Sequence, residues 1–237
     1  MASQYDRVSQ SRRSVGSLFK IFVYTTAIKN GISPLAVYQD SPVQYGSWRP
    51  ENYDKAHHGY MTLAHAFVTS NNIVAVKLLE EVSPKEVIQT AREMGIESEM
   101  QPNLSLALGA VEMSLKEITA AFNVLNNKGI YIEPYAIERI VGRHGELLYE
   151  HLPYKKWVLT RSARDTMVEL MQGVVRYGTG RAAFINHPSA GKTDTSDDHR
   201  DAWFIGFTPQ VTTGVWIGND DNSLMVGITG GTLPANI

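Results

Sequence analysis

Apolar residues recur with the period of a helix through the first part of the chain. They crowd a helix-like pattern between Ser17 and Asn30, and Gly31 follows where a C-terminal cap would lie. A second helical stretch, residues 62–69, breaks at Ser70-Asn71-Asn72 and restarts at residues 73–79. The pattern predicts a first helix with Ser17 in its first turn, followed by two helices separated by a short polar break.

Three further helices fit the pattern, and two of them have signals at their N-termini. Ser83 precedes Pro84 as an N-cap, and Ser114 with Glu117 forms a capping-box pattern. The expected helices cover residues 84–94, 114–127 and 160–177.

The last third of the chain changes to short β-prone runs at residues 189–196, 202–207 and 211–218. A hairpin is also expected where residues 135–141 and 146–150 flank the turn residues 142–145. These elements predict an α/β (α+β) sandwich, with a mostly antiparallel sheet flanked by helices. We expect the sheet's strands to come from the C-terminal third and the start of the chain, with a cleft between the sheet edge and the helical half.

Composition narrows the function without identifying it. The 237 residues are 43% hydrophobic and 19% charged, which is typical of a globular chain that folds as one large domain over residues 1–237. The formal charge of -2, with no block of one sign, argues against nucleic acid as a partner. Because the chain has no cysteine, disulfides, thiolate catalysis and cysteine metal sites are excluded.

One pair of residues can carry nucleophilic chemistry. In Ser17-Leu18-Phe19-Lys20 a hydroxyl and an amine lie three residues apart, so a helix projects both on nearly one face. Serine needs a base to remove its proton, and lysine can act as one if apolar surroundings lower its pKa. The alternative is a capping serine beside a solvated lysine. Roughly 0.7 such pairs are expected by chance in this composition, so the motif alone is weak.

Two elements further along the chain change this balance: Ser70-Asn71-Asn72 at the helix break and Gly191-Lys192-Thr193-Asp194-Thr195 on an expected strand. Their order resembles the serine-lysine, serine-x-asparagine and lysine-threonine-glycine motifs of penicillin-binding proteins and serine β-lactamases. The surrounding sequence resembles the bifunctional, class A branch of the penicillin-binding proteins over nearly the full chain. The family's nucleophile helix and second-motif segment correspond to residues 13–24 and 62–79, and the class A branch is resembled by residues 178–180, 200–209 and 229–234.

The resemblance implies a serine D,D-transpeptidase that β-lactams inhibit. Ser17 would attack the D-alanyl-D-alanine carbonyl while Lys20 takes its proton, which forms an acyl-enzyme. Ser70 would relay a proton to the departing D-alanine. Asn72 would hold Lys20 and the amide of the donor peptide. An amine of a second stem peptide would then take the acyl group.

The resemblance also places substrate-binding groups on the expected strand. Lys192, with the hydroxyls of Thr193 and Thr195, would receive the terminal carboxylate, and its charge would help to keep Lys20 neutral. The backbone N–H groups of Ser17 and Thr195 would form the oxyanion hole, and such donors contribute on the order of 3 to 4 kcal/mol.

Asp194 is the larger of two departures from the family pattern, which has glycine at this position. Because side chains alternate along a strand, we expect the carboxylate to point away from Thr193 and Thr195. The expected cost is steric and lies behind the site, and weak acylation would follow. The other departure, Val15 and Leu18 near the nucleophile, removes no catalytic group.

Three other functions stay open. A non-catalytic relative could have kept the fold as a scaffold or binding domain, a D,D-carboxypeptidase would use water in place of the acceptor amine, and a β-lactamase would need a deacylating base that no sequence element identifies. We expect no cofactor and no metal, since the adjacent His57 and His58 would point apart on a loop. Trp48, Tyr53 and Tyr60 are candidates for lining a peptide cleft.

We also expect the chain to be an excised domain. By the same resemblance, the full protein would carry a glycan-polymerising domain and a membrane anchor upstream, and the sheet would lack one or more N-terminal strands. The domain would then lie outside the cytoplasmic membrane. Its expected partners are peptidoglycan stem peptides, β-lactams and other cell-wall synthesis proteins, with membrane contact only through the upstream anchor.

Overall fold

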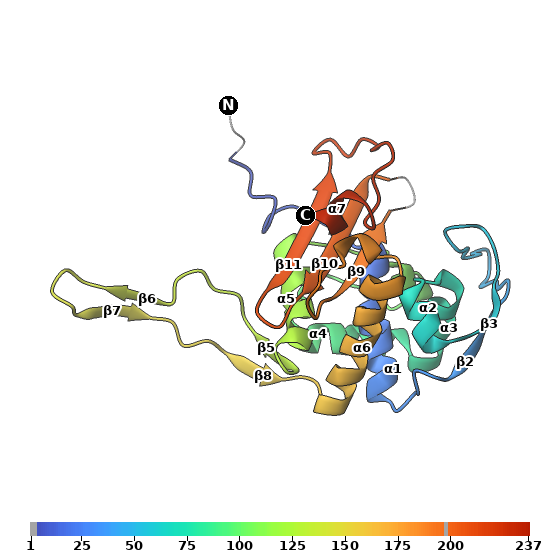
Figure 1. Ribbon diagram of the computed structural model, residues 1–237, viewed down its shortest axis with the longest axis horizontal. Coiled ribbons are helices and arrows are strands. Elements are labelled where there is room, and N and C mark those ends of the chain that lie inside the picture. The colour runs from blue at the N-terminus through green and yellow to red at the C-terminus, as the bar shows by residue number, and fades with distance from the viewer. Residues whose placement is uncertain (1–3, 197–198) are drawn as a thin grey trace.

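The C-terminal third forms an antiparallel sheet, as the alternating pattern predicts. A computed structural model describes residues 4–196 and 199–237, and in them the strand order is β11-β10-β9. These strands are β9 (Ala190–Thr195), β10 (Asp201–Phe207) and β11 (Thr212–Gly218). β10 pairs antiparallel with both neighbours, so β9 lies at an edge of this sheet, as Figure 1 shows.

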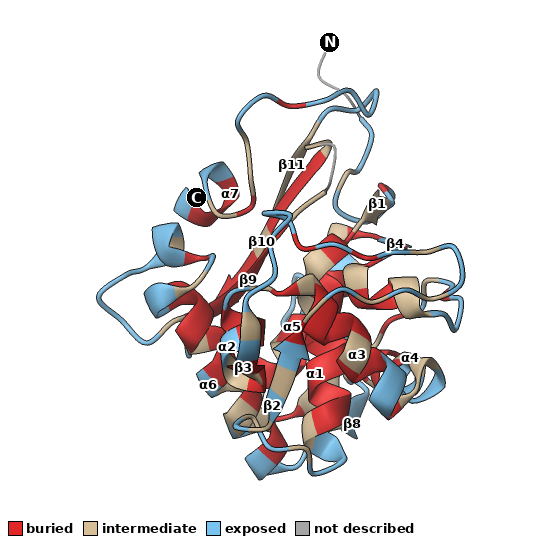
Figure 2. Ribbon diagram, turned by 90° about the vertical axis from the view of Figure 1, so that its right-hand side faces the viewer, coloured by how far each residue is buried: buried red, intermediate tan, exposed pale blue. Residues whose placement is uncertain are grey.

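The helical half is built around α1 (Lys20–Lys29), which follows directly on a 3-10 turn, η1 (Gly16–Phe19). Residues 20–27 of α1 are all buried, and the helix contacts α3 (Asn72–Val82), α4 (Pro84–Glu93) and α6 (Arg161–Tyr177). Figure 2 shows this buried helix in the core of the molecule. Burial on every side explains why its apolar residues form a nearly continuous run.

Helices flank the sheet, and the predicted sandwich is confirmed. α6 contacts β9, whereas α5 (Leu115–Asn126) packs against β10 and β11. The short α7 (Leu233–Asn236) also contacts β10 and β11. Among residues 4–196 and 199–237, no helix has the length and the apolar content that a membrane span requires.

The start of the chain departs from the prediction. We expected the start of the chain to add a strand to the main sheet, and for the described residues this prediction is wrong. The strand found there, β1 (Arg13–Ser14), pairs with β4 (Glu112–Met113) in a separate two-stranded sheet. The backbone groups here find partners other than the sheet's backbone: Val15 N donates to Val111 O at 3.2 Å, and Ser14 O accepts from the side chain of Trp203, Nε1, at 2.9 Å. Buried backbone groups must be paired, and these contacts satisfy them without a sheet register.

The predicted hairpin is confirmed as β6 (Arg139–Val141) and β7 (Leu147–Glu150), which extend away from the body (Figure 1). The other elements are short. They are β2 (Val37–Asp40), β3 (Gly59–Thr62), α2 (Leu63–Val68), η2 (Leu104–Leu108), β5 (Ile130–Ile132), β8 (Lys155–Trp157) and η3 (Arg181–Ala183).

Helix caps follow the sequence signals only in part. The Ser114 hydroxyl accepts from Glu117 N at 3.1 Å, as a capping box requires, but the Glu117 carboxylate accepts from Glu97 N and Ser98 N. Ser83 precedes α4, yet its side chain makes no capping hydrogen bond.

Candidate active site

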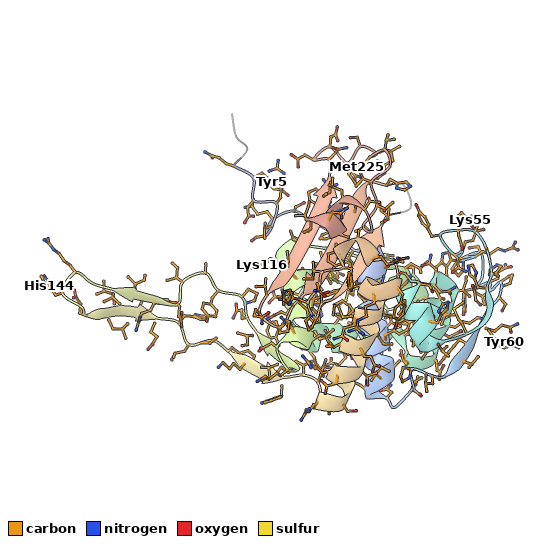
Figure 3. The ribbon with its side chains drawn as sticks, in the orientation of Figure 1. Tyr5, Lys55, Tyr60, Lys116, His144 and Met225 are labelled. Carbon is orange, nitrogen blue, oxygen red and sulfur yellow. The ribbon has the colours of Figure 1, made fainter. Side chains whose placement is uncertain are left out.

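A cleft of about 880 Å³ opens between the sheet edge and the helical half. Five of the residues singled out from the sequence line it: Ser17, Ser70, Asn72, Thr193 and Thr195. The loop after β2 forms another wall and contributes Trp48 and Tyr53. Tyr60 does not line the cleft, since it is 75% exposed and points away from the body in Figure 3.

Lys20 lies beneath the cleft, with a fully buried side chain. In the described structure its amine lies within hydrogen-bond distance of three oxygens: Ser70 O at 2.7 Å, Ser70 Oγ at 3.1 Å and Asn72 Oδ1 at 2.6 Å. Burial lowers the pKa of Lys20 well below its usual value, and the charge of Lys192 lowers it further, against the opposing effect of Asp194. This environment favours the neutral amine that a base requires.

Ser70 lies in the break between α2 and α3, where the backbone turns sharply. Its φ of 58° is in the left-handed region, which is uncommon for a residue other than glycine. The next residue caps α3, since Asn71 Oδ1 accepts from Val74 N at 2.9 Å. The break thereby presents the Ser70 hydroxyl to two amines, Lys20 Nζ at 3.1 Å and Lys192 Nζ at 2.9 Å.

Asp40, which the sequence analysis missed, holds this break in place. Its buried carboxylate accepts from Asn71 Nδ2 and Asn52 Nδ2, each at 2.8 Å, and from His58 N at 2.9 Å. Asn52 Oδ1 in turn accepts from the backbone N–H of Asn72 at 2.9 Å. These hydrogen bonds outweigh desolvation and lower the pKa of Asp40. No local pattern marks this residue, because its partners are 12 to 31 residues away.

β9 supplies Lys192 and the two threonines. Lys192 Nζ is fully buried and donates to Thr193 O at 3.0 Å as well as to Ser70. On the other face of the strand, the Thr193 hydroxyl lies 2.6 Å from that of Thr179, and Thr195 Oγ1 accepts from Gly230 N at 2.9 Å. Thr179, inside the Gly178-Thr-Gly180 segment, thus also lines the cleft.

The expectation that Asp194 acts behind the site is wrong. Its side chain does lie opposite the threonines, but η1 packs against β9 there, so the carboxylate contacts the backbone of Ser17, which lines the cleft. Asp194 Oδ1 accepts from Ser17 N at 2.5 Å. A Cβ on Gly16, which has a φ of 46°, would lie only 2.1 Å from this oxygen, so the carboxylate fills space that glycine leaves open.

The two adjacent histidines contact separate carboxylates. His57 Nδ1 lies 3.2 Å from Asp40 Oδ1, and His58 Nε2 lies 2.8 Å from Asp54 Oδ2. Within the described ranges, no cluster of three or more His, Cys, Asp or Glu side chains has the arrangement of a metal site.

Comparison with known proteins agrees with this architecture. Residues 2–222 match the family model of the penicillin-binding protein transpeptidase domain. The chain is 36% identical to penicillin-binding protein 1A of Aquifex aeolicus, over 92% of this chain and 31% of that protein. It therefore spans about a third of the length of this curated relative.

Solved structures show the same fold. The crystal structure of penicillin-binding protein 1A from Haemophilus influenzae superposes with a TM-score of 0.90 and 25% identity, covering 98% of this chain and 42% of that one. The PonA1 protein of Mycobacterium tuberculosis, solved in complex with penicillin V, has a TM-score of 0.89 and 23% identity, covering 98% and 69%.

Proposed function

The chain belongs to the penicillin-binding protein transpeptidase domain family, and from that premise we propose that it is a serine D,D-transpeptidase that cross-links peptidoglycan stem peptides through an acyl-enzyme at Ser17. One observation carries the proposal. The buried Lys20 amine lies one helical turn from Ser17 and within hydrogen-bond distance of Ser70, at the base of the cleft that both serines line.

The hydrogen bonds of Lys20 support its role as the base. A neutral amine has two N–H bonds and one lone pair. Ser70 O and Asn72 Oδ1 can only accept, so they take the two N–H groups at 2.7 and 2.6 Å. The lone pair remains for a hydroxyl proton, from Ser17 during attack or from Ser70 during relay. Catalytic hydrogen bonds often tighten only when substrate is bound.

The proposed reaction has two halves. Ser17 Oγ bonds to the penultimate D-alanine carbonyl carbon, and its proton passes to Lys20 Nζ. The bond to the terminal D-alanine nitrogen breaks, and that nitrogen takes the proton through Ser70 Oγ. An acceptor amine then attacks the ester carbonyl and gives up a proton by the reverse route, and Ser17 Oγ leaves with a proton from Lys20. The cross-link is an amide, and the free serine is regenerated.

Substrate binding would use β9. Thr193 and Thr195 line the cleft, and the Lys192 charge lies beneath them, so we assign the terminal carboxylate to this end. The backbone N–H groups of Ser17 and Thr195 would receive the carbonyl oxygen. A β-lactam presents a carboxylate and an acyl carbonyl in the same order, and its leaving nitrogen stays tethered after ring opening.

We further propose that the domain works as part of a longer, membrane-anchored cell-wall synthase, outside the cytoplasmic membrane. The chain's share of about a third of its curated relative's length supports a longer protein, and the anchor and the location follow from the proposed role in the cell wall. A D,D-carboxypeptidase would use the same acyl-enzyme with water as acceptor. Release of D-alanine from a stem pentapeptide, measured with and without an added amine acceptor, separates the two reactions through the aminolysis product.

Incubation with excess penicillin followed by intact-mass analysis tests the nucleophile. We expect one penicillin added to the wild type and to Ser14→Ala, a matched control because Ser14 also lines the cleft. Ser17→Ala should gain no mass. An adduct on folded Ser17→Ala, or none on the folded wild type after prolonged incubation, would contradict the proposal. The second result would favour a non-catalytic binding domain.

A further inference from the structure

The Asp194 carboxylate lies where the proposed reaction places the substrate's carbonyl oxygen. Its Oδ1 accepts from the backbone N–H of Ser17 at 2.5 Å, a short hydrogen bond to one of the two donors that would form the oxyanion hole. Asp194 is among the residues that line the cleft, and it is only 3% exposed. One proposed oxyanion donor is therefore already bonded inside the protein.

The second proposed donor faces the same carboxylate. Ser196 N donates to Asp201 O across the sheet, and alternate N–H groups of an edge strand point in opposite directions. The Thr195 N–H therefore points from β9 to the free edge of the sheet, where Ser17 lies. It is close enough to Asp194 to favour the charged form of the carboxylate.

We propose that Asp194 is an internal occupant of the oxyanion hole, which competes with the substrate carbonyl for the N–H groups of Ser17 and Thr195 and so restrains acylation. This inference rests on the proposed transpeptidase function and adds self-inhibition to it. The occupant has the charge that the hole is built to stabilise, because a carboxylate oxygen resembles the tetrahedral oxyanion more closely than a neutral carbonyl does.

The occupant is held incompletely, which allows substrate to displace it. Among the described residues, Asp194 Oδ2 has no hydrogen-bond partner although it is buried. Lys192 on β9 and Lys20 on α1 face the carboxylate and attract it, yet burial outweighs them and raises its pKa. η1 brings no titratable side chain to this contact. Movement of the side chain away from Ser17 N would open the hole.

The charge of Asp194 has a second effect on the same reaction, because it raises the pKa of Lys20 and so opposes the neutral base. Two substitutions separate the effects. Asp194→Asn removes the charge but keeps an acceptor of the same shape, whereas Asp194→Gly removes both. Asp221→Gly is the control, since it makes the same change in an exposed turn outside the cleft.

The experiment measures second-order acylation rate constants with a fluorescent penicillin at pH 8, with folding checked by circular dichroism. Loss of one oxyanion donor typically slows catalysis by about 10² to 10³-fold, so we expect Asp194→Gly to acylate about 100-fold faster than wild type. The acylation rate of Asp194→Asn should fall between those of Asp194→Gly and wild type, and the rate of Asp221→Gly should match that of wild type. Asp194→Ala, which also lacks an acceptor, replaces the glycine variant if that one unfolds.

Two results would overturn this inference alone. Equal rates in all variants, with an adduct that still needs Ser17, would show that the carboxylate does not compete. Equal acceleration by asparagine and glycine would assign the effect to charge alone. If no folded variant forms a Ser17-dependent adduct, the proposed function fails and the inference fails with it.

Discussion

Removal of the Asp40 carboxylate should destabilise the protein and slow acylation together. In the structure Oδ2 accepts from Asn52 Nδ2, Asn71 Nδ2 and His58 N, and Oδ1 faces His57 Nδ1. Asp40→Ala leaves the two buried amides without this acceptor, and each unsatisfied buried donor costs about 1–3 kcal/mol. We therefore expect a loss of about 3–5 kcal/mol in the free energy of unfolding.

Asp40→Asn tests the geometry more finely. Its amide oxygen can take the place of Oδ2 and accept the same three hydrogen bonds, while its NH₂ faces His57. Bonds to a neutral acceptor are weaker than bonds to a charged one, so the expected cost is about 1–2 kcal/mol. Asp54→Asn is the control, because Asp54 is exposed and its pair with His58 should contribute less than about 1 kcal/mol.

The pH dependence has a definite sign. The pKa of Asp40 is lower in the folded protein than its usual 3.8. The contribution of this carboxylate to the free energy of unfolding is therefore fully present above pH 3.8 and is lost as pH falls through the folded-state pKa. Urea unfolding of wild type and Asp40→Asn should give a difference that is constant from pH 7 to about pH 5 and narrows below about pH 4. If Asp40→Ala were within 1 kcal/mol of wild type, or as stable as Asp40→Asn, the network would have no role in stability.

Two further predictions concern the amines. Lys20→Met should slow penicillin acylation by about 10² to 10⁴-fold, the usual contribution of a general base, whereas Lys29→Met on the same helix should not; equal rates would exclude Lys20 as the base. Lys192→Met should move the acid limb of the acylation rate to higher pH, because loss of its charge raises the pKa of Lys20. Lys77→Met, outside the cleft, is its control, and an unmoved limb would show that the two amines do not interact.

Local sequence determined the parts of the site that depend on short-range geometry. The spacing of Ser17 and Lys20 needs only one helical turn to bring them to one face, and the break at Ser70 follows from polar residues between two apolar stretches. The strand that carries Lys192 is readable from its own β-prone run. The order of these motifs was enough to identify the family and the fold class.

Tertiary structure decided what depends on which elements face one another. Alternation along β9 correctly placed Asp194 opposite the threonines, but only packing showed that η1, with the Ser17 amide, covers that face. Asp40 joins the site through amides far along the chain, and the approach of Lys192 to Lys20 through Ser70 is equally non-local. Periodicity reports which side of an element is buried, whereas the partner on that side is set by the fold as a whole.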